Sequence, residues 1–263
     1  MEKIITDIIK RAGKIMLSAH LEEDNSDGAV SEKWGSANFV TKYDVAVQDF
    51  IMSEIKKSYP RAVFIAEEKE NDPRLLSGEL CFVIDPIDGT KNFINDYRHS
   101  CISIAAISGG ETVLGAVYDP YLDELFIAEK GKVARLNGKK MTVSERPFEL
   151  AIAAYGTSPY YKDTLAEATF ALTKDIFMAA SDIRRTGSAA LDLAYLAAGR
   201  NDLFFEMILS PWDVAAGALL VTEAGGLITD INGRPIDLSS ASSVFAGNRD
   251  AHPRLLAIAE KYR

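Results

Sequence analysis

The N-terminal segment alternates apolar and polar residues with the period of an α-helix. Within residues 2–20, the apolar positions are Ile4, Ile5, Ile8, Ala12, Ile15, Met16 and Ala19. This spacing predicts an amphipathic helix, and a similar pattern predicts a second helix from about Thr41 to Lys57. Residues 22–38 between them are polar and contain Asp-Gly and Gly-Ser pairs, so we expect a loop there.

Short apolar runs bounded by turn residues predict strands in the rest of the first half. These strands are expected at residues 62–66, 80–85, 101–107, 113–118 and 124–128. The last three are expected to be antiparallel, because Gly-Gly and Asp-Pro turns separate them. Asn137-Gly138 is a hairpin signal. This half of the chain is therefore typical of an α+β arrangement.

The second half alternates strands with helices. Strands are predicted at residues 151–154, 176–180, 202–207 and 227–229, and helices at residues 162–173, 187–198 and 213–224. Such alternation is typical of α/β structure. No low-complexity linker separates the halves, so we expect a single domain over residues 1–263, with lobes of about 1–145 and 146–263.

Composition and charge argue against several classes of protein. Hydrophobic residues make up 48% of the 263 residues and charged residues 25%, as in ordinary globular domains. The net charge is 29 − 38 = −9, which argues against general binding to nucleic acid or anionic membranes. Two cysteines are too few for a disulfide framework. No apolar run reaches the ~20 residues of a membrane span, so we expect a cytoplasmic protein.

One short run carries the strongest chemical signal in the sequence. The apolar residues 82–84 lead directly into Asp85, and Asp88-Gly89-Thr90 follows. Two carboxylates at the end of a buried strand are costly unless a cation lies between them. Hard oxygen ligands that converge in this way suit Mg²⁺. We therefore predict a divalent-metal site at this strand end.

Other acids also lie at the ends of predicted elements, where open α/β sheets usually place their sites. Glu67-Glu68 follows a predicted strand, and Asp213 opens a predicted helix. Taken alone, Glu67-Glu68 is typical of a solvated surface and Asp213 of a helix N-cap. Thr90 leaves two alternatives open, either a helix start whose free N–H groups bind a phosphate or a plain N-cap.

Taken together, these motifs resemble the inositol monophosphatase family over nearly the whole chain. The resemblance rests on Val40-Thr41-Lys42-Tyr43-Asp44, Ile65-Ala66-Glu67-Glu68, residues 82–95, Arg184-Arg185-Thr186-Gly187-Ser188-Ala189-Ala190, Phe205-Glu206-Met207 and residues 212–226. It implies an α+β fold, built as a layered αβαβα sandwich, and a lithium-sensitive, Mg²⁺-dependent phosphatase. It also implies a homodimer with two or three Mg²⁺ ions in each active site.

The resemblance implies a role for each matching residue. The metal ligands are expected to be Glu67, Asp85, the backbone carbonyl of Ile87, Asp88 and Asp213. The catalytic residues are expected to be Asp44, Thr90 and Glu67, with the Asp44–Thr90 pair activating the attacking water. The substrate-binding residues are expected to be Asp88, Gly89, Thr90, Gly187, Ser188, Ala189 and Glu206. Lys33 matches a lysine in a loop near the site.

The resemblance favours hydrolysis of myo-inositol monophosphate to inositol and phosphate, without a covalent intermediate. The expected partner is then a small phosphorylated sugar alcohol or sugar. Fructose 1,6-bisphosphate and a 3′(2′),5′-bisphosphate nucleotide stay open as substrates. Arg184-Arg185 precedes the predicted ring-contacting loop, and one of the two guanidinium groups could hold a second phosphate. A non-catalytic, metal-dependent regulatory binding protein is the third alternative.

Overall fold

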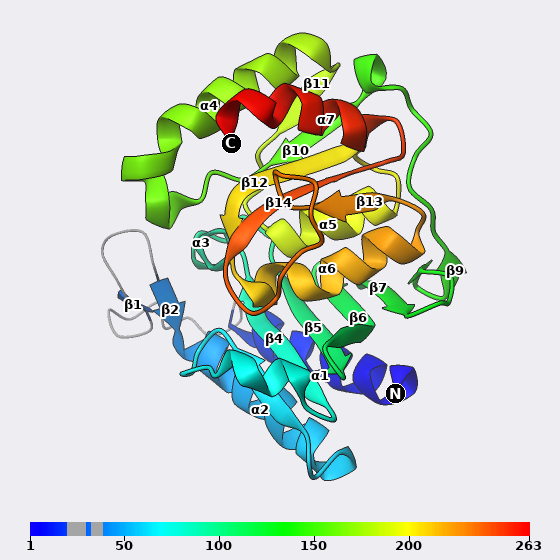
Figure 1. The fold of residues 1–263 in the computed structure, drawn as a ribbon. Coiled ribbons are helices and arrows are strands. Elements are labelled where there is room, and N and C mark those ends of the chain that lie inside the picture. The colour runs from blue at the N-terminus through cyan, green and yellow to red at the C-terminus, as the bar shows by residue number, and fades with distance from the viewer. Residues whose placement is uncertain (20–29, 33–38) are drawn as a thin grey trace.

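The computed structural model describes residues 1–19, 30–32 and 39–263. Layers of helix and sheet alternate through the molecule (Figure 1). The predicted α+β class and its αβαβα layers are thereby confirmed. Most of the predicted loop over residues 22–38 lies outside the described residues, and so does Lys33.

The first two layers are a pair of helices and a seven-stranded sheet. Helices α1 (Glu2–Ser18) and α2 (Lys42–Ser58) pack on this sheet through a core that includes Ile5, Ile51 and Phe82. In sheet order, the strands are β3 (Val63–Ala66), β4 (Cys81–Asp88), β5 (Cys101–Ser108), β6 (Glu111–Asp119), β7 (Glu124–Glu129), β8 (Arg135–Leu136) and β9 (Lys139–Lys140). Strands β3 and β4 are parallel, so both end at the same edge, and the other neighbours are antiparallel.

Helices α5 (Ala189–Ala197) and α6 (Pro211–Glu223) form the layer between the two sheets. Their core joins apolar side chains of both sheets, such as Val83 and Phe204. Helix α6 approaches β6 at Gly115, where a Cβ would lie 2.6 Å from the carbonyl oxygen of Ala216. A side chain at this position would therefore push α6 away from the large sheet.

The smaller sheet has five strands, and two further helices cover its outer face. In sheet order, the strands are β11 (Asp182–Arg184), β10 (Ile152–Tyr155), β12 (Leu203–Leu209), β14 (Ser242–Gly247) and β13 (Leu227–Thr229). Strand β10 is parallel to both of its neighbours, whereas β14 is antiparallel to both of its own. Helices α4 (Lys162–Ala179) and α7 (Ala251–Ala259) pack on this sheet through Leu172, Phe245 and Leu255.

Some sequence-based expectations need correction. Residues 176–180 are not a strand: α4 continues to Ala179 with Ile176 buried in the helix, and the nearby strand is β11. Part of the predicted loop forms β1 (Val30–Glu32), which pairs with β2 (Phe39–Thr41). The sequence patterns do not predict β14 and α7. The other predicted helices and strands occur near their expected limits.

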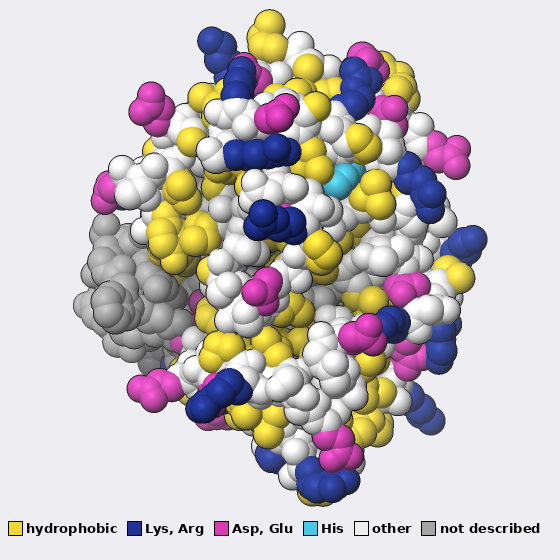
Figure 2. All heavy atoms as spheres, in the orientation of Figure 1, with side chains coloured by type: hydrophobic (Ala, Val, Ile, Leu, Met, Phe, Trp, Pro, Cys, Tyr) yellow, Lys and Arg dark blue, Asp and Glu magenta, His cyan; other side chains and the backbone are white. Residues whose placement is uncertain are grey.

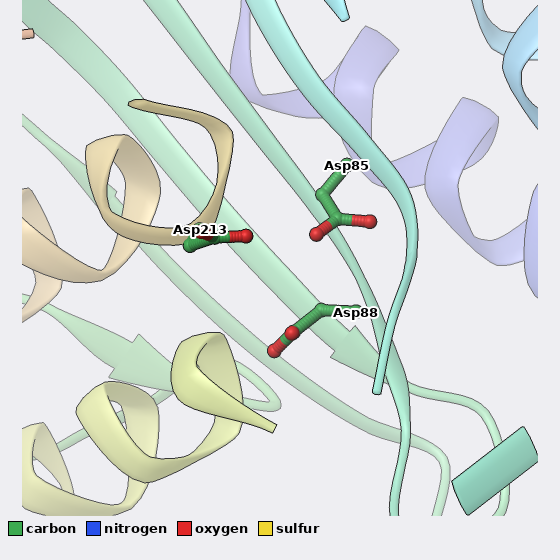
Figure 3. A group of neighbouring side chains, drawn as sticks. All are labelled: Asp85, Asp88 and Asp213. Carbon is green, nitrogen blue, oxygen red and sulfur yellow. The ribbon is translucent and has the colours of Figure 1, made fainter. Parts of the chain in front are cut away.

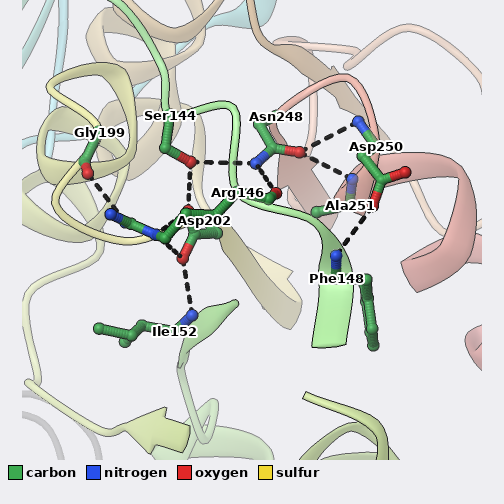
Figure 4. Close-up of polar contacts among 9 residues, drawn as sticks. All are labelled: Ser144, Arg146, Phe148, Ile152, Gly199, Asp202, Asn248, Asp250 and Ala251. Atoms are coloured by element: carbon green, nitrogen blue, oxygen red, sulfur yellow. Dashed lines mark hydrogen bonds and ion pairs between the residues drawn. The ribbon is translucent and has the colours of Figure 1, made fainter. Parts of the chain in front are cut away.

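A buried polar network connects segments that flank the small sheet (Figure 4). Asp202 is fully buried, and both of its carboxylate oxygens accept from Arg146 Nε at 2.9 Å. It also accepts from the Ile152 N–H at 2.7 Å and from the hydroxyl of Ser144. The side-chain amide of Asn248 donates to Ser144 Oγ at 3.0 Å and to the Arg146 carbonyl at 2.9 Å. The buried charge is thus compensated on every side.

The surface in Figure 2 mixes Lys and Arg with Asp and Glu side chains, and no large patch of one sign covers this face. Within the part of the chain that the structure describes, no helix has the length and apolarity needed to cross a membrane. The cytoplasmic location and the absence of general nucleic-acid binding stay predictions.

Candidate active site

Asp85 and Asp88 point into the same space because strand β4 is irregular between them. In a regular strand, residues three apart face opposite sides of the sheet. The pairing of β4 with β5 changes register between Asp85 opposite Ser103 and Asp88 opposite Cys101. Such an irregularity bends a strand and redirects its side chains. Figure 3 shows both carboxylates turned toward the space beside Asp213.

Asp213 comes from the neighbouring layer, in the first turn of α6. The helix begins at Pro211 with Ser210 as its N-cap, so Asp213 is not the N-cap itself. Its Oδ2 accepts a hydrogen bond from the Ser210 N–H at 2.7 Å. Carboxylate oxygens of Asp85, Asp88 and Asp213 all lie within 4.8 Å of one another. Asp213 therefore both stabilises the start of α6 and joins the acidic cluster.

Burial and mutual repulsion make this cluster costly to ionise. Asp85 and Asp88 are buried, and Asp213 is half-buried. Burial raises the pKa of Asp85 well above its usual value, and the charges of Glu67 and Asp88 raise it further. Burial and the charges of Asp88 and Glu67 raise the pKa of Asp213 in the same way. A divalent cation between the carboxylates would offset the cost of burial and the mutual repulsion, so these residues fit Mg²⁺.

Asp88 is also attached to the start of helix α5. Its Oδ2 accepts from the Ser188 hydroxyl at 2.6 Å and from the Ala190 N–H at 2.7 Å. Burial raises the pKa of Asp88, and these hydrogen bonds oppose the rise. Ser188 is the N-cap of α5, so Asp88 connects the acidic cluster to the predicted substrate loop.

Glu67 lies near the cluster because β3 and β4 end at the same edge of the sheet. Its N–H donates to the Ile84 carbonyl at 3.2 Å, and it lines the same cavity as Asp85. The Glu68 N–H instead donates to the side chain of Gln48 at 3.0 Å, and Glu68 does not line the described cavity. The structure thus separates the two neighbouring glutamates.

Asp44 and Thr90 meet although 46 residues separate them in sequence. The Thr90 hydroxyl lies 3.5 Å from Asp44 Oδ1 and 3.1 Å from the carbonyl oxygen of Ile87. A hydroxyl has one proton, so it donates to one of these acceptors at a time. Asp44 is fully buried, and its Oδ2 accepts from the Thr41 N–H at 2.7 Å and hydroxyl at 2.5 Å. The start of α2 thereby fixes the carboxylate beside Thr90.

The chain passes from β4 into α3 (Thr90–Ile94) through Gly89. Gly89 is the N-cap with φ 86°, a left-handed conformation that favours glycine, so Thr90 is not the N-cap. A Cβ on Gly89 would lie 3.2 Å from the carbonyl oxygen of Gly187, whose φ is 97°. The Asn92 side chain donates to the Thr186 carbonyl at 2.9 Å and stabilises the contact between Gly89 and Gly187. The two glycines thus bring the start of α3 against the segment that precedes α5.

These elements surround a cavity of about 470 Å³, a size that suits a small molecule. The sequence-predicted residues that line it are Glu67, Asp85, Ile87, Asp88, Gly89, Thr90, Gly187, Ser188, Ala189, Glu206 and Asp213. Asp44 is not among the lining residues and reaches the site through Thr90. The structure therefore brings together the residues that the resemblance selects, whereas their roles stay proposals.

Glu206 reaches the cavity from β12 and is almost completely buried. Its Oε1 accepts from the Ser158 N–H at 2.7 Å and from the Ser158 hydroxyl at 3.3 Å. Gly156 leaves room for the carboxylate, because a Cβ there would lie 1.8 Å from Glu206 Oε2. Burial raises the pKa of Glu206 to about 7, although the Ser158 N–H and the charge of Arg185 lower it. Its carboxylate can accept hydrogen bonds from hydroxyl groups in the cavity.

The sequence analysis missed the loop that follows β10. Ser158, Tyr160 and Tyr161 line the cavity, and Ser158 holds Glu206 in place. The available signal is the Gly-Thr-Ser-Pro turn that begins at Gly156, directly after a predicted strand. Strand ends in the parallel part of a sheet are common positions for binding residues.

The two adjacent arginines have different surroundings. Both side chains are exposed, and Arg184 donates to the carboxylate of Asp182 and to the carbonyl of Ile183. Arg185 lines the cavity, and its Nη2 donates to Thr157 Oγ1 at 3.0 Å. Arg184 is absent from the cavity lining. The structure therefore distinguishes two residues that the sequence leaves equivalent.

Comparison with known proteins agrees with this geometry. The sequence matches the inositol monophosphatase family over residues 1–263. The chain belongs to this family. It is 39% identical over 258 residues to the Nus factor SuhB of Escherichia coli K12, covering 98% of this chain and 94% of that relative.

Solved structures show the same fold for members of this family. The extragenic suppressor protein suhB of Bartonella henselae is 34% identical with a TM-score of 0.90, covering 99% of this chain and 98% of that one. An IMPase of Thermotoga maritima is 31% identical with a TM-score of 0.87 and the same coverage, 99% and 98%. Family membership supports a metal-dependent phosphatase. The substrate and the number of ions stay open.

Proposed function

We propose that this inositol monophosphatase family member is a Mg²⁺-dependent phosphomonoesterase that hydrolyses myo-inositol monophosphate to inositol and phosphate. The observation that carries the proposal is the convergence of Asp85, Asp88 and Asp213 within 4.8 Å in the lining of a cavity that Glu206 also lines. The three aspartates can hold cations, which in turn bind a phosphate. Glu206 can accept hydrogen bonds from the hydroxyl groups of an alcohol. One cavity thus offers a place for both halves of the ester.

The cations would be held by Glu67, Asp85, Asp88, Asp213 and the carbonyl of Ile87. Bound Mg²⁺ would supply an acidified water and would neutralise the charge of the phosphate. The four carboxylates carry four negative charges, which two divalent ions balance. This agrees with the raised pKa values of Asp85 and Asp213, whose main causes are burial and the charges of neighbouring acids.

Thr90 and Asp44 would position the attacking water and accept its proton. The water oxygen forms a bond to phosphorus while the bond from phosphorus to the alcohol oxygen breaks. The Thr90 hydroxyl accepts the proton of the water as it donates its own to Asp44, which is 3.5 Å away. If the Ile87 carbonyl held a cation, Asp44 would be the acceptor that remains for the Thr90 hydroxyl. The alcohol oxygen leaves and gains a proton from solvent.

The phosphate would be cradled by the N–H groups of Gly89 and Thr90, at the start of α3. The ring would lie against Gly187, Ser188 and Ala189, which precede or begin α5 and line the cavity.

Glu206 would accept hydrogen bonds from ring hydroxyls, and Asp88 would contact both the cation and the ring. A buried acceptor of this kind discriminates against a substrate that lacks the hydroxyl, because the acceptor is then left unpaired.

Phosphate release from myo-inositol 1-phosphate in the presence of Mg²⁺ tests the proposal directly. Asp88→Asn is expected to reduce kcat/KM by at least about a thousandfold, and to fold without Mg²⁺, since one charge leaves the acidic cluster. Glu167→Gln, on the exposed side of α4, is the matched control and should keep full activity. Near-normal turnover by a folded Asp88→Asn variant would refute the role of Asp88.

A regulatory function is the second candidate, because the curated relative from Escherichia coli is named a Nus factor. Such a role would not require turnover. If the wild-type protein binds Mg²⁺ but releases no phosphate from inositol phosphate or from a bisphosphate, the regulatory candidate replaces the enzymatic one. The homodimer implied by the resemblance belongs to the same proposal, and light scattering tests it.

A further inference from the structure

We propose that Asp192 is a further acceptor for ring hydroxyls, so that the cavity selects phosphomonoesters of polyols with hydroxyl groups on several carbon atoms. The inference deepens the proposed function and rests on it, because the phosphate must occupy the acidic cluster when the ring reaches Asp192. The family resemblance assigns no role to this residue. The inference concerns recognition of the alcohol and leaves the reaction unchanged.

The position of Asp192 is the first observation. It lies in the first turn of α5, four residues after the N-cap Ser188, and residues four apart share one face of a helix. The Asp192 N–H donates to the Ser188 carbonyl at 3.1 Å, and the Ser188 hydroxyl donates to Asp88 at 2.6 Å. Asp192 therefore lies on the face of α5 that is turned toward the acidic cluster.

The second observation is an unused oxygen on a buried side chain. Asp192 is only 2% exposed, yet it lines the cavity. Its Oδ2 accepts from the Thr186 hydroxyl at 2.8 Å, whereas no described residue donates a hydrogen bond to Oδ1. A buried carboxyl oxygen without a donor is costly. A ligand hydroxyl in the cavity would supply the missing donor.

The third observation is the grouping of three carboxyl groups that come from different elements. Asp88 ends β4, Glu206 lies in β12 and Asp192 lies in α5, and all three line the cavity. Burial raises the pKa of Asp192 well above its usual value, and the charges of Asp88 and Glu206 raise it further. The three groups thus surround one space. A ligand satisfies them together when its hydroxyls stand on different carbon atoms, as in a cyclic polyol.

Thr186 supplies the matched control, because Asp192 also holds the loop before α5. Thr186→Val removes the hydrogen bond to Asp192 but keeps the carboxyl group and the Thr186 carbonyl, which accepts from Asn92 at 2.9 Å. An effect that arises from a loosened loop would appear in Thr186→Val and in Asp192→Ala. An effect that arises from a lost contact to the ring would appear in Asp192→Ala alone.

The test compares inositol 1-phosphate with its deoxy analogues, each of which lacks one ring hydroxyl. The deoxy penalty is the factor by which kcat/KM with Mg²⁺ falls when that hydroxyl is removed. For at least one analogue, the penalty should be about tenfold in the wild type and in Thr186→Val, and close to one in Asp192→Ala. The ratio cancels general damage to the site, because it affects both substrates. Asp192→Leu, which fills more of the same space, is measured if the alanine variant does not fold.

A second readout separates this inference from the proposed function. Calorimetry with Mg²⁺ measures the binding of phosphonate analogues of inositol 1-phosphate and of its deoxy forms, which are not hydrolysed. If no ester is hydrolysed, the proposed function fails, yet a deoxy penalty in affinity that disappears in the Asp192 variants alone still supports the subsite. The inference is overturned if the phosphonates do not bind, if the wild type shows no deoxy penalty, or if the Asp192 variants keep every penalty. Equal loss of the penalty in Thr186→Val also overturns it.

Discussion

Replacement of Glu206 by glutamine should stabilise the protein at high pH. The structure places this carboxylate in an almost completely buried position, where burial raises its pKa from 4.5 to about 7. The ionised form is therefore less stable in the folded state than in the unfolded chain. Glutamine keeps an oxygen that accepts from the Ser158 N–H but carries no charge.

The sign and size of the effect follow from the two pKa values. Between pH 4.5 and about 7, the unfolded chain has lost this proton and the folded protein retains it, so wild-type stability falls as pH rises. The full difference corresponds to about 3 kcal/mol, since one pKa unit equals about 1.4 kcal/mol. The free energy of unfolding of Glu206→Gln should thus exceed that of the wild type by almost nothing at pH 4.5 and by about 3 kcal/mol at pH 8.

Urea unfolding at a series of pH values measures this difference, with EDTA present so that cation binding does not contribute. The quantity of interest is the free energy of unfolding of Glu206→Gln minus that of the wild type. Glu167→Gln, on the exposed surface of α4, is the control and should show a difference that does not change with pH. A difference for Glu206→Gln that is flat, or that shrinks as pH rises, would refute the assigned burial cost.

Three further predictions concern the site and the core. Gly156→Ala should raise KM for inositol 1-phosphate about tenfold, because its Cβ would lie 1.8 Å from Glu206 Oε2, and a steady-state assay checks this. Arg146→Ala should lower the free energy of unfolding by about 3 kcal/mol in chemical denaturation, because Asp202 keeps a fully buried charge without its cation. Li⁺ should inhibit phosphate release in a dose-dependent way, because it competes for the carboxylates while supplying half the charge of Mg²⁺. Full activity at tens of millimolar Li⁺ would contradict this last prediction.

The sequence predicts elements well where apolar periodicity is long. Helices α1 and α2 are examples, because several turns repeat the same pattern. Residues 176–180 show the limit: Ile-Phe-Met-Ala-Ala is apolar at every position and fits a buried strand or a helix equally well. Packing of Ile176 against the small sheet decides the outcome in favour of α4, and such packing is not visible in a local window.

The acidic cluster can be predicted from sequence only in part, because only some of its signals are local. Asp85 and Asp88 stand at a strand end with apolar neighbours, which is a local signal. The Asp44–Thr90 contact spans 46 residues and is predictable through the family resemblance rather than from spacing. The hydrogen bond from the Ser158 N–H to Glu206 joins residues 48 apart in sequence and depends on the pairing of β10 with β12. Contacts of this kind are set by topology, which a single sequence does not display.

The close approach at Gly115 has a consequence for the ions. Asp85 and Asp88 belong to the large sheet, whereas Asp213 belongs to α6, so a cation between them would act as a cross-link between two layers. The gap that this cross-link must span is set by how closely α6 approaches β6, and a Cβ on Gly115 would lie 2.6 Å from Ala216. Affinity for Mg²⁺ at this cluster would therefore depend partly on core packing, and a methyl group at Gly115 would weaken it without touching any of the proposed ligands.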